Sequence, residues 1–119
     1  METEILEFKG EKITVLKSEG IIIREVQDAL DLMADSSYFG SRRIVINENQ
    51  LIPEFFDLKS GIAGEILQKF STYDVQLAII GDFSKYSGKS LRGFIFESNK
   101  LRRINFVSTL EEAKERLTK

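Results

Sequence analysis

Apolar residues follow two patterns along this chain, short unbroken runs and stripes with a helical period. The unbroken runs, at Arg43–Asn47 and Val75–Gly81, are typical of strands that helices cover on both faces. Each run is followed by a helical pattern, over Pro53–Phe70 and Ser87–Ser98. This alternation indicates parallel strands joined by crossover helices. We therefore expect an α/β fold with the two runs as adjacent central strands.

The two ends of the chain extend this sheet. Two short strand patterns, Glu4–Phe8 and Lys12–Lys17, are separated by Lys9-Gly10-Glu11, which predicts a tight hairpin turn. Lysines flank the second of these strands, which favours an edge position. A shorter apolar run, Ile104–Val107, predicts a further strand on the outside of the sheet.

Two more helices complete the expected architecture. Residues 24–38 carry an apolar stripe, and the last helix is expected to begin at a capping box formed by Ser108 and Glu111. The apolar residues of these two stripes are Val26, Ala29, Leu30, Met33, Leu110, Ala113 and Leu117. We predict a single domain over residues 1–119, with a mixed sheet of about five strands and four helices, in which an N-terminal hairpin precedes alternating helices and strands.

The composition argues against most enzyme and metal chemistry. The chain has no cysteine and no histidine. It therefore lacks thiol chemistry, the commonest general base and the commonest zinc ligand. The carboxylates that remain are not fixed by their spacing into an opposed pair. The sequence favours a non-enzymatic protein that needs no cofactor and no metal.

The charge balance gives no preference for nucleic acid or anionic membranes, since the net charge is −2. No apolar run is long enough to span a bilayer and no signal-peptide pattern is present, so we expect a cytoplasmic protein. Basic residues are concentrated between Lys85 and Arg103. Two interpretations of that stretch remain open, a solvated helix face and a site for an anion or an acidic partner.

Residues Gly81–Ser90, GDFSKYSGKS, are similar to a phosphate-binding P-loop but have the wrong spacing. The first glycine of that motif belongs at position 83, where Phe83 stands, so we predict no nucleotide hydrolysis. Ligands of parallel sheets bind beyond the carboxyl ends of the strands. The residues expected to form an anion or ligand edge there are Asn47, Asp82, Lys85, Tyr86, Lys89, Ser90 and Arg92.

The helix expected over residues 53–70 contains two glycines, Gly61 and Gly64, away from its apolar face. Each glycine inside a helix costs about 1 kcal/mol relative to alanine, which suggests that another backbone approaches closely. That backbone is either the protein's own Pro53–Leu58 segment or a docking partner. The partner-binding residues under this hypothesis are Ser60, Gly61, Gly64, Glu65 and Gln68.

The residues around Ser60 resemble a known regulatory fold. A helix that opens Lys59-Ser60-Gly61-Ile62 after an apolar strand is similar to the STAS fold of bacterial anti-sigma-factor antagonists. In those proteins a helix N-terminal Asp-Ser-Ser/Thr-Gly carries the regulatory phosphorylation site, and a partner kinase docks around it. Ser60 and Gly61 match the last two positions of that motif, while Leu58 and Lys59 differ from the first two. The resemblance implies that Ser60 is a candidate phosphorylation site.

Longer segments resemble family 4180 of bacterial domains of unknown function. The segments that carry this resemblance are VQDALDLM (26–33), PEFFDLKSGIAGEILQKF (53–70), AIIGDFSKY (78–86) and SLRGFIFESN (90–99). The resemblance implies a bacterial cytoplasmic protein with a STAS-like fold. We expect a regulatory module that binds a protein partner or itself. The alternative is a small-molecule or anion-binding protein, with weak enzymatic function at most, that uses the strand-end edge near Asp82, Lys85, Tyr86 and Lys89.

Overall fold

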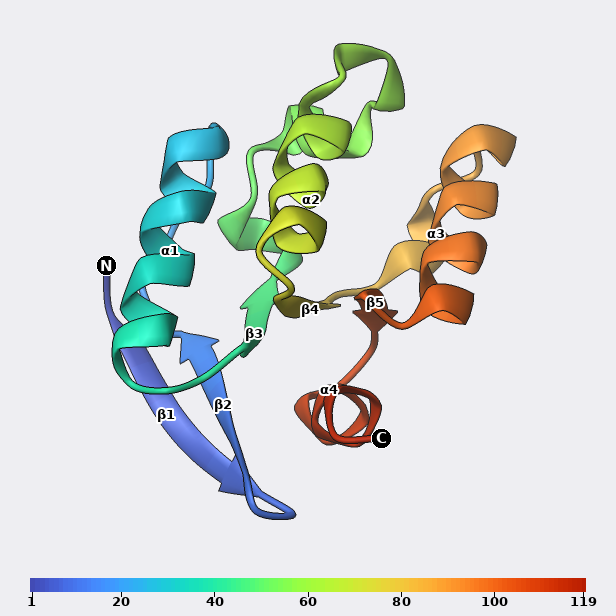
Figure 1. Ribbon diagram of the computed structural model, residues 1–119. Helices are drawn as coiled ribbons and strands as arrows, with labels where there is room; N and C mark the ends of the chain where they lie inside the picture. The colour runs from blue at the N-terminus through green and yellow to red at the C-terminus, as the bar shows by residue number, and fades with distance from the viewer.

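The computed structural model, which describes residues 1–119, contains a five-stranded mixed sheet with helices on both faces (Figure 1). The strands lie across the sheet in chain order: β1 (Thr3–Phe8), β2 (Glu11–Leu16), β3 (Arg43–Asn47), β4 (Gln76–Ile80) and β5 (Ile104–Val107). Strands β1 and β2 are antiparallel, and every other neighbouring pair is parallel. The predicted α/β fold, the N-terminal hairpin and the adjacent positions of β3 and β4 are confirmed.

Four α-helices cover the sheet unequally. These are α1 (Val26–Tyr38), α2 (Ile62–Thr72), α3 (Lys89–Leu101) and α4 (Leu110–Leu117). Helices α1, α2 and α3 lie on one face, and α4 lies alone on the other (Figure 1). None of these helices combines the length and the apolar composition needed to cross a membrane.

The central strands are apolar without interruption because both of their faces are covered. In β3, Ile44 and Ile46 belong to the larger core beneath α1, α2 and α3, while Val45 belongs to the smaller core beneath α4. In β4, Leu77 and Ile79 alternate with Ala78 in the same way. Successive strand residues point to opposite faces, so a doubly covered strand needs an apolar residue at every position.

Strand β2 is not at the edge of the sheet, contrary to the sequence prediction. Its residues Ile13–Leu16 are all buried, and β3 pairs with it in parallel. The lysines that suggested an edge lie just outside this buried stretch. Thr14 and Ser36 are both buried, and their hydroxyl oxygens are 2.7 Å apart, which links β2 to α1. The edge strand is β1, joined to β2 by a turn in which Lys9 and Gly10 both have positive φ.

The helix expected over residues 53–70 is interrupted. Two short 3-10 turns, Pro53–Phe56 and Leu58–Ser60, precede α2, which begins at Ile62. The Asp57 carboxylate accepts a hydrogen bond from the Lys59 amide, and Gly61 has a left-handed backbone with φ of 78°. A residue in that conformation ends the preceding turn and redirects the chain into α2.

The start of α4 lies one residue later than predicted. The hydroxyl of Thr109, not that of Ser108, accepts a hydrogen bond from the Glu112 amide at 3.1 Å. The Glu112 carboxylate in turn accepts from the Ser108 amide at 2.8 Å. The adjacent hydroxyl residues Ser108 and Thr109, each followed three positions later by a glutamate, fit both registers. The structure has the register in which Ala113 and Leu117 are fully buried.

Candidate functional site

Glu48 organises the surface beyond the carboxyl ends of β3 and β4. Its Oε1 accepts hydrogen bonds from the Asp82 amide at 3.2 Å and from Lys85 Nζ at 2.8 Å. Its Oε2 lies 3.5 Å from the Tyr86 hydroxyl. The structure thus brings together three of the residues expected at the ligand edge, Asp82, Lys85 and Tyr86. The group that joins them is Glu48, which directly follows β3 at the same edge of the sheet.

Gly81 makes room for this arrangement. A Cβ atom at position 81 would lie 2.7 Å from Cδ of Glu48, closer than real side-chain contacts allow. Any other residue at that position would push the Glu48 side chain away from its partners. A glycine directly after an apolar strand was therefore a sequence signal for a close side-chain approach.

Aromatic stacking connects this surface to the segment before α2. The ring of Tyr86 stacks on that of Phe56, with centroids 5.1 Å apart and planes 16° apart. Phe83, in the same loop, meets Phe106 of β5 edge-on at 5.2 Å. The Asp82–Tyr86 loop and the 3-10 turn that contains Phe56 therefore form one continuous surface.

Three ionisable groups of this surface, Asp82, Lys85 and Tyr86, have pKa values that are shifted away from neutrality. Hydrogen bonds from the side chain and amide of Ser84 lower the pKa of Asp82. The hydrogen bond to Glu48 raises the pKa of Lys85, and burial raises the pKa of Tyr86. A general acid or base works best with a pKa near the operating pH. These shifts suit a structural cluster better than acid–base catalysis.

The other predicted ligand-edge residues do not join this cluster. Asn47 lines a separate open pocket of about 540 Å³ beyond the ends of β2 and β3. Lys89, Ser90 and Arg92 are exposed in the first turn of α3, and no hydrogen bond or ion pair joins their side chains to the Glu48 cluster.

Ser60 closes the turn that leads into α2. Its hydroxyl oxygen lies 2.8 Å from the Glu54 carbonyl and 2.7 Å from the Asp57 carbonyl, which share its single hydrogen. The same oxygen accepts a hydrogen bond from the Ile62 amide at 3.2 Å. The hydroxyl therefore holds the two 3-10 turns against the first residue of α2.

Gly64 faces open space. A Cβ atom there would meet no atom within 4 Å, so the hypothesis that the Pro53–Leu58 segment packs on this glycine is wrong. The other residues predicted to bind a partner, Ser60, Gly61, Glu65 and Gln68, are likewise exposed.

A groove of about 260 Å³ separates α2 from α3 beside this glycine. It is lined by Gly64, Leu67, Gln68, Ser71, Phe94, Ser98, Leu101, Arg103 and Ile104. The sequence pattern indicated the α2 side of this groove but not the α3 side. The residues of α3 that face it are spaced by three or four positions, as one helix face requires.

We expect Glu48→Gln to lower the pKa of both Tyr86 and Lys85, because the charge and hydrogen bonds of Glu48 raise both. In the unchanged protein, the raised pKa values of Tyr86 and Lys85 stabilise the folded state. This stabilisation is fully present below the unfolded-state pKa, about 10, and is lost as the pH rises through the folded-state pKa. The variant should therefore lose less stability above about pH 10.

Phenolate absorbance in a Tyr38→Phe/Tyr73→Phe background reports Tyr86 alone. Glu54→Gln, which removes an exposed carboxylate outside the cluster, is the matched control and should leave the Tyr86 midpoint in place. An identical midpoint for the Glu48 and Glu54 variants would contradict the assigned role of Glu48.

The fold and the sequence each have known relatives. A crystal structure of a candidate anti-sigma factor antagonist from Thermotoga maritima is similar over 98% of this chain and 95% of that chain, with a TM-score of 0.50 and 14% identity. At this identity the similarity shows the STAS-like fold alone. No curated protein matches the chain.

The family model described as a domain of unknown function, DUF4180, matches residues 8–117. Because that match spans almost the whole chain, the protein belongs to the DUF4180 family.

Proposed function

We propose that this protein is a non-enzymatic regulatory module that binds a protein partner at the α2–α3 groove and the adjoining surface around Ser60 and Gly64. The observation that carries the proposal is that Gly64, a helical glycine with open space beside it, lines the α2–α3 groove, whereas Gly93, the other open glycine inside a helix, does not. A glycine inside a helix costs about 1 kcal/mol relative to alanine, and no contact within the molecule requires it here. The absence of a side chain at position 64 leaves room for a binding partner to approach the helix closely from outside the molecule.

The lining of the groove supports a protein partner. Leu67, Phe94 and Leu101 give it an apolar lining, and the small residues Gly64, Ser71 and Ser98 widen it. A groove with these properties fits an apolar segment of another protein, as in helix-in-groove recognition. The structural neighbour from Thermotoga maritima is described as a candidate anti-sigma factor antagonist, which supports a regulatory class of function.

Ser60 is the candidate switch of this surface. Phosphorylation would replace the hydrogen that the Glu54 and Asp57 carbonyls share, so both hydrogen bonds would be lost. The phosphate would lie next to the N-terminus of α2, where the helix dipole stabilises negative charge. The modification would thereby rearrange the 3-10 turns beside the groove.

The test compares two exposed helical glycines. Gly64→Gln fills the edge of the groove, and Gly93→Gln makes the same change on α3 at a position that does not line it. Both sites are open, so both variants should fold and gain up to about 1 kcal/mol of stability. Quantitative mass spectrometry of proteins cross-linked to each variant in native lysate measures the outcome.

We expect Gly64→Gln to lose the captured partner and Gly93→Gln to keep it. Ser60→Glu, a charge mimic of phosphoserine, should change capture in the same assay. If the two glutamine variants capture the same proteins in the same amounts, the groove is not the docking surface.

A further inference from the structure

Four arginines lie where β3, β4 and β5 begin, at the edge of the sheet opposite to the Glu48 cluster. Arg42 and Arg43 lead into β3, and Arg102 and Arg103 lead into β5, on either side of the start of β4. They line a pocket of about 240 Å³, completed by Asp74, Gln76 and Leu101. We call this the arginine pocket.

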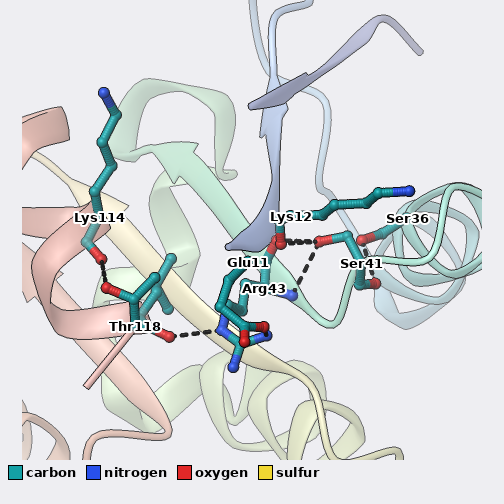
Figure 2. Close-up of polar contacts among 8 residues, drawn as sticks. Glu11, Lys12, Ser36, Ser41, Arg43, Lys114 and Thr118 are labelled. Carbon is teal, nitrogen blue, oxygen red and sulfur yellow. Dashed lines mark hydrogen bonds and ion pairs between the residues drawn. The ribbon is translucent and has the colours of Figure 1, made fainter. Parts of the chain in front are cut away.

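The carboxylates of the molecule neutralise the arginine pocket only in part. Asp74 lies 2.8 Å from Arg103 and 3.6 Å from Arg42, and one carboxylate serves both guanidinium groups. Arg43 is paired with Glu11 at 2.7 Å (Figure 2). Its Nε also donates a hydrogen bond to the Leu117 carbonyl. Arg102 has no ion pair. Two positive charges in the pocket are therefore not compensated.

The backbone conformation of Arg102 also indicates a functional role for this residue. This residue ends α3 in a left-handed conformation with φ of 61°, a position that usually favours glycine. A non-glycine residue is strained in this conformation, because its Cβ atom lies too close to the following carbonyl oxygen. Its charge also repels the three other guanidinium groups. Neither term favours an arginine for the stability of the fold, and such exceptions concentrate at functional sites.

We propose that the arginine pocket binds a phosphate monoester as its dianion. A phosphate monoester carries a charge of about −2 at pH 7, which matches the two uncompensated positive charges. Guanidinium groups bind phosphate oxygens in a forked, charge-assisted geometry. Asp74 shows that Arg42 and Arg103 converge on one oxyanion, and its side chain is 72% exposed, so that it can move aside. Exposed Leu101 provides an apolar contact for the organic part of the ester.

This proposal does not rest on the proposed partner surface, although the arginine pocket and the α2–α3 groove share Leu101 and Arg103 in their linings. It is therefore tested on the isolated protein, and its failure would leave the groove proposal unchanged. The probe is phenyl phosphate at pH 7.5, followed through the backbone amide resonances. We expect saturable shifts at Arg42, Asp74 and Arg103.

Three substitutions make the test specific. Arg102→Gln should weaken binding at least about fivefold, since it removes a charge-assisted donor. Arg24→Gln removes the same charge from an exposed residue before α1, outside the pocket, and should change affinity less than about twofold. Asp74→Asn should strengthen binding, because it removes the competing carboxylate while asparagine tolerates the left-handed backbone at φ of 56°.

The source of the phosphate is distinguished by a second probe, a short peptide with one phosphoserine. Tighter binding of the peptide than of phenyl phosphate supports a protein-borne phosphate, and the reverse supports a small molecule. Absence of saturable shifts with both probes overturns the proposal. Equal effects of Arg102→Gln and Arg24→Gln overturn it as well, because binding would then follow net charge rather than the pocket.

Discussion

Phe55→Ala is expected to destabilise the protein by about 3–5 kcal/mol, the usual range for removing a fully buried phenylalanine. Phe55 is 1% exposed and belongs to the larger core. It lies in the 3-10 turn of Pro53–Phe56, where few backbone hydrogen bonds hold the chain. Its ring therefore anchors the segment that carries Ser60. Urea denaturation monitored by circular dichroism measures the loss.

The neighbouring Phe56 is the matched control. It is only half-buried, and its ring packs against the outside of the larger core and stacks on Tyr86. Phe56→Ala should cost less than half as much as Phe55→Ala, and it should release the Asp82–Tyr86 loop. Equal losses for the two variants would show that Phe55 does not anchor the segment.

The sequence predicted the sheet well because the sheet is built from local patterns. Unbroken apolar runs identified β3 and β4, since only strands covered on both faces are apolar at every position. The position of β2 was wrong because Lys12 and Lys17, at the ends of its buried stretch, suggested an exposed edge strand. Its apolar stretch, Ile13–Leu16, contains a threonine whose buried hydroxyl is paired with Ser36, a residue 22 positions away. Such a partner is not visible in local spacing.

Residues within the segment before α2 indicated its interruption, but the helical spacing of the apolar residues favoured one continuous helix. Asp57 and Gly61 are a turn-forming residue and a left-handed glycine, and both favour breaks over a continuous helix. The apolar residues of Pro53–Phe70 nevertheless recur at spacings that a single helix would also produce. Periodicity places apolar residues on a face, but it does not show whether the backbone is continuous between them.

The candidate sites were only half predictable, because each joins residues from distant parts of the sequence. Arg102 and Arg103 lie in the basic stretch between Lys85 and Arg103, which is evident from the sequence. Arg42 and Arg43 lie about 60 positions earlier, and only the parallel order of β3, β4 and β5 brings the two pairs to one edge. The groove beside Gly64 likewise needs α3, whose position across the sheet follows from topology.

Leu117→Ala is expected to destabilise the protein by about 2–5 kcal/mol. Leu117 is fully buried in the smaller core, with Val45, Ala78 and Val107 of the sheet. Only seven buried residues form that core, so the loss of one large side chain leaves α4 with little else to hold it. Leu101→Ala is the control, because Leu101 is 79% exposed and its truncation should change stability by less than about 0.5 kcal/mol.

The consequence of Leu117→Ala should extend beyond α4. The Leu117 carbonyl accepts the hydrogen bond from Arg43 Nε at 2.7 Å, which fixes one wall of the arginine pocket. If α4 loosens, this acceptor is withdrawn from Arg43 while the Glu11 carboxylate remains. Hydrogen exchange should therefore become faster in α4 and at the start of β3, but not in α2, which lies on the other face of the sheet. Equal protection of α4 in Leu117→Ala and Leu101→Ala would show that the sheet holds this helix without the Leu117 side chain.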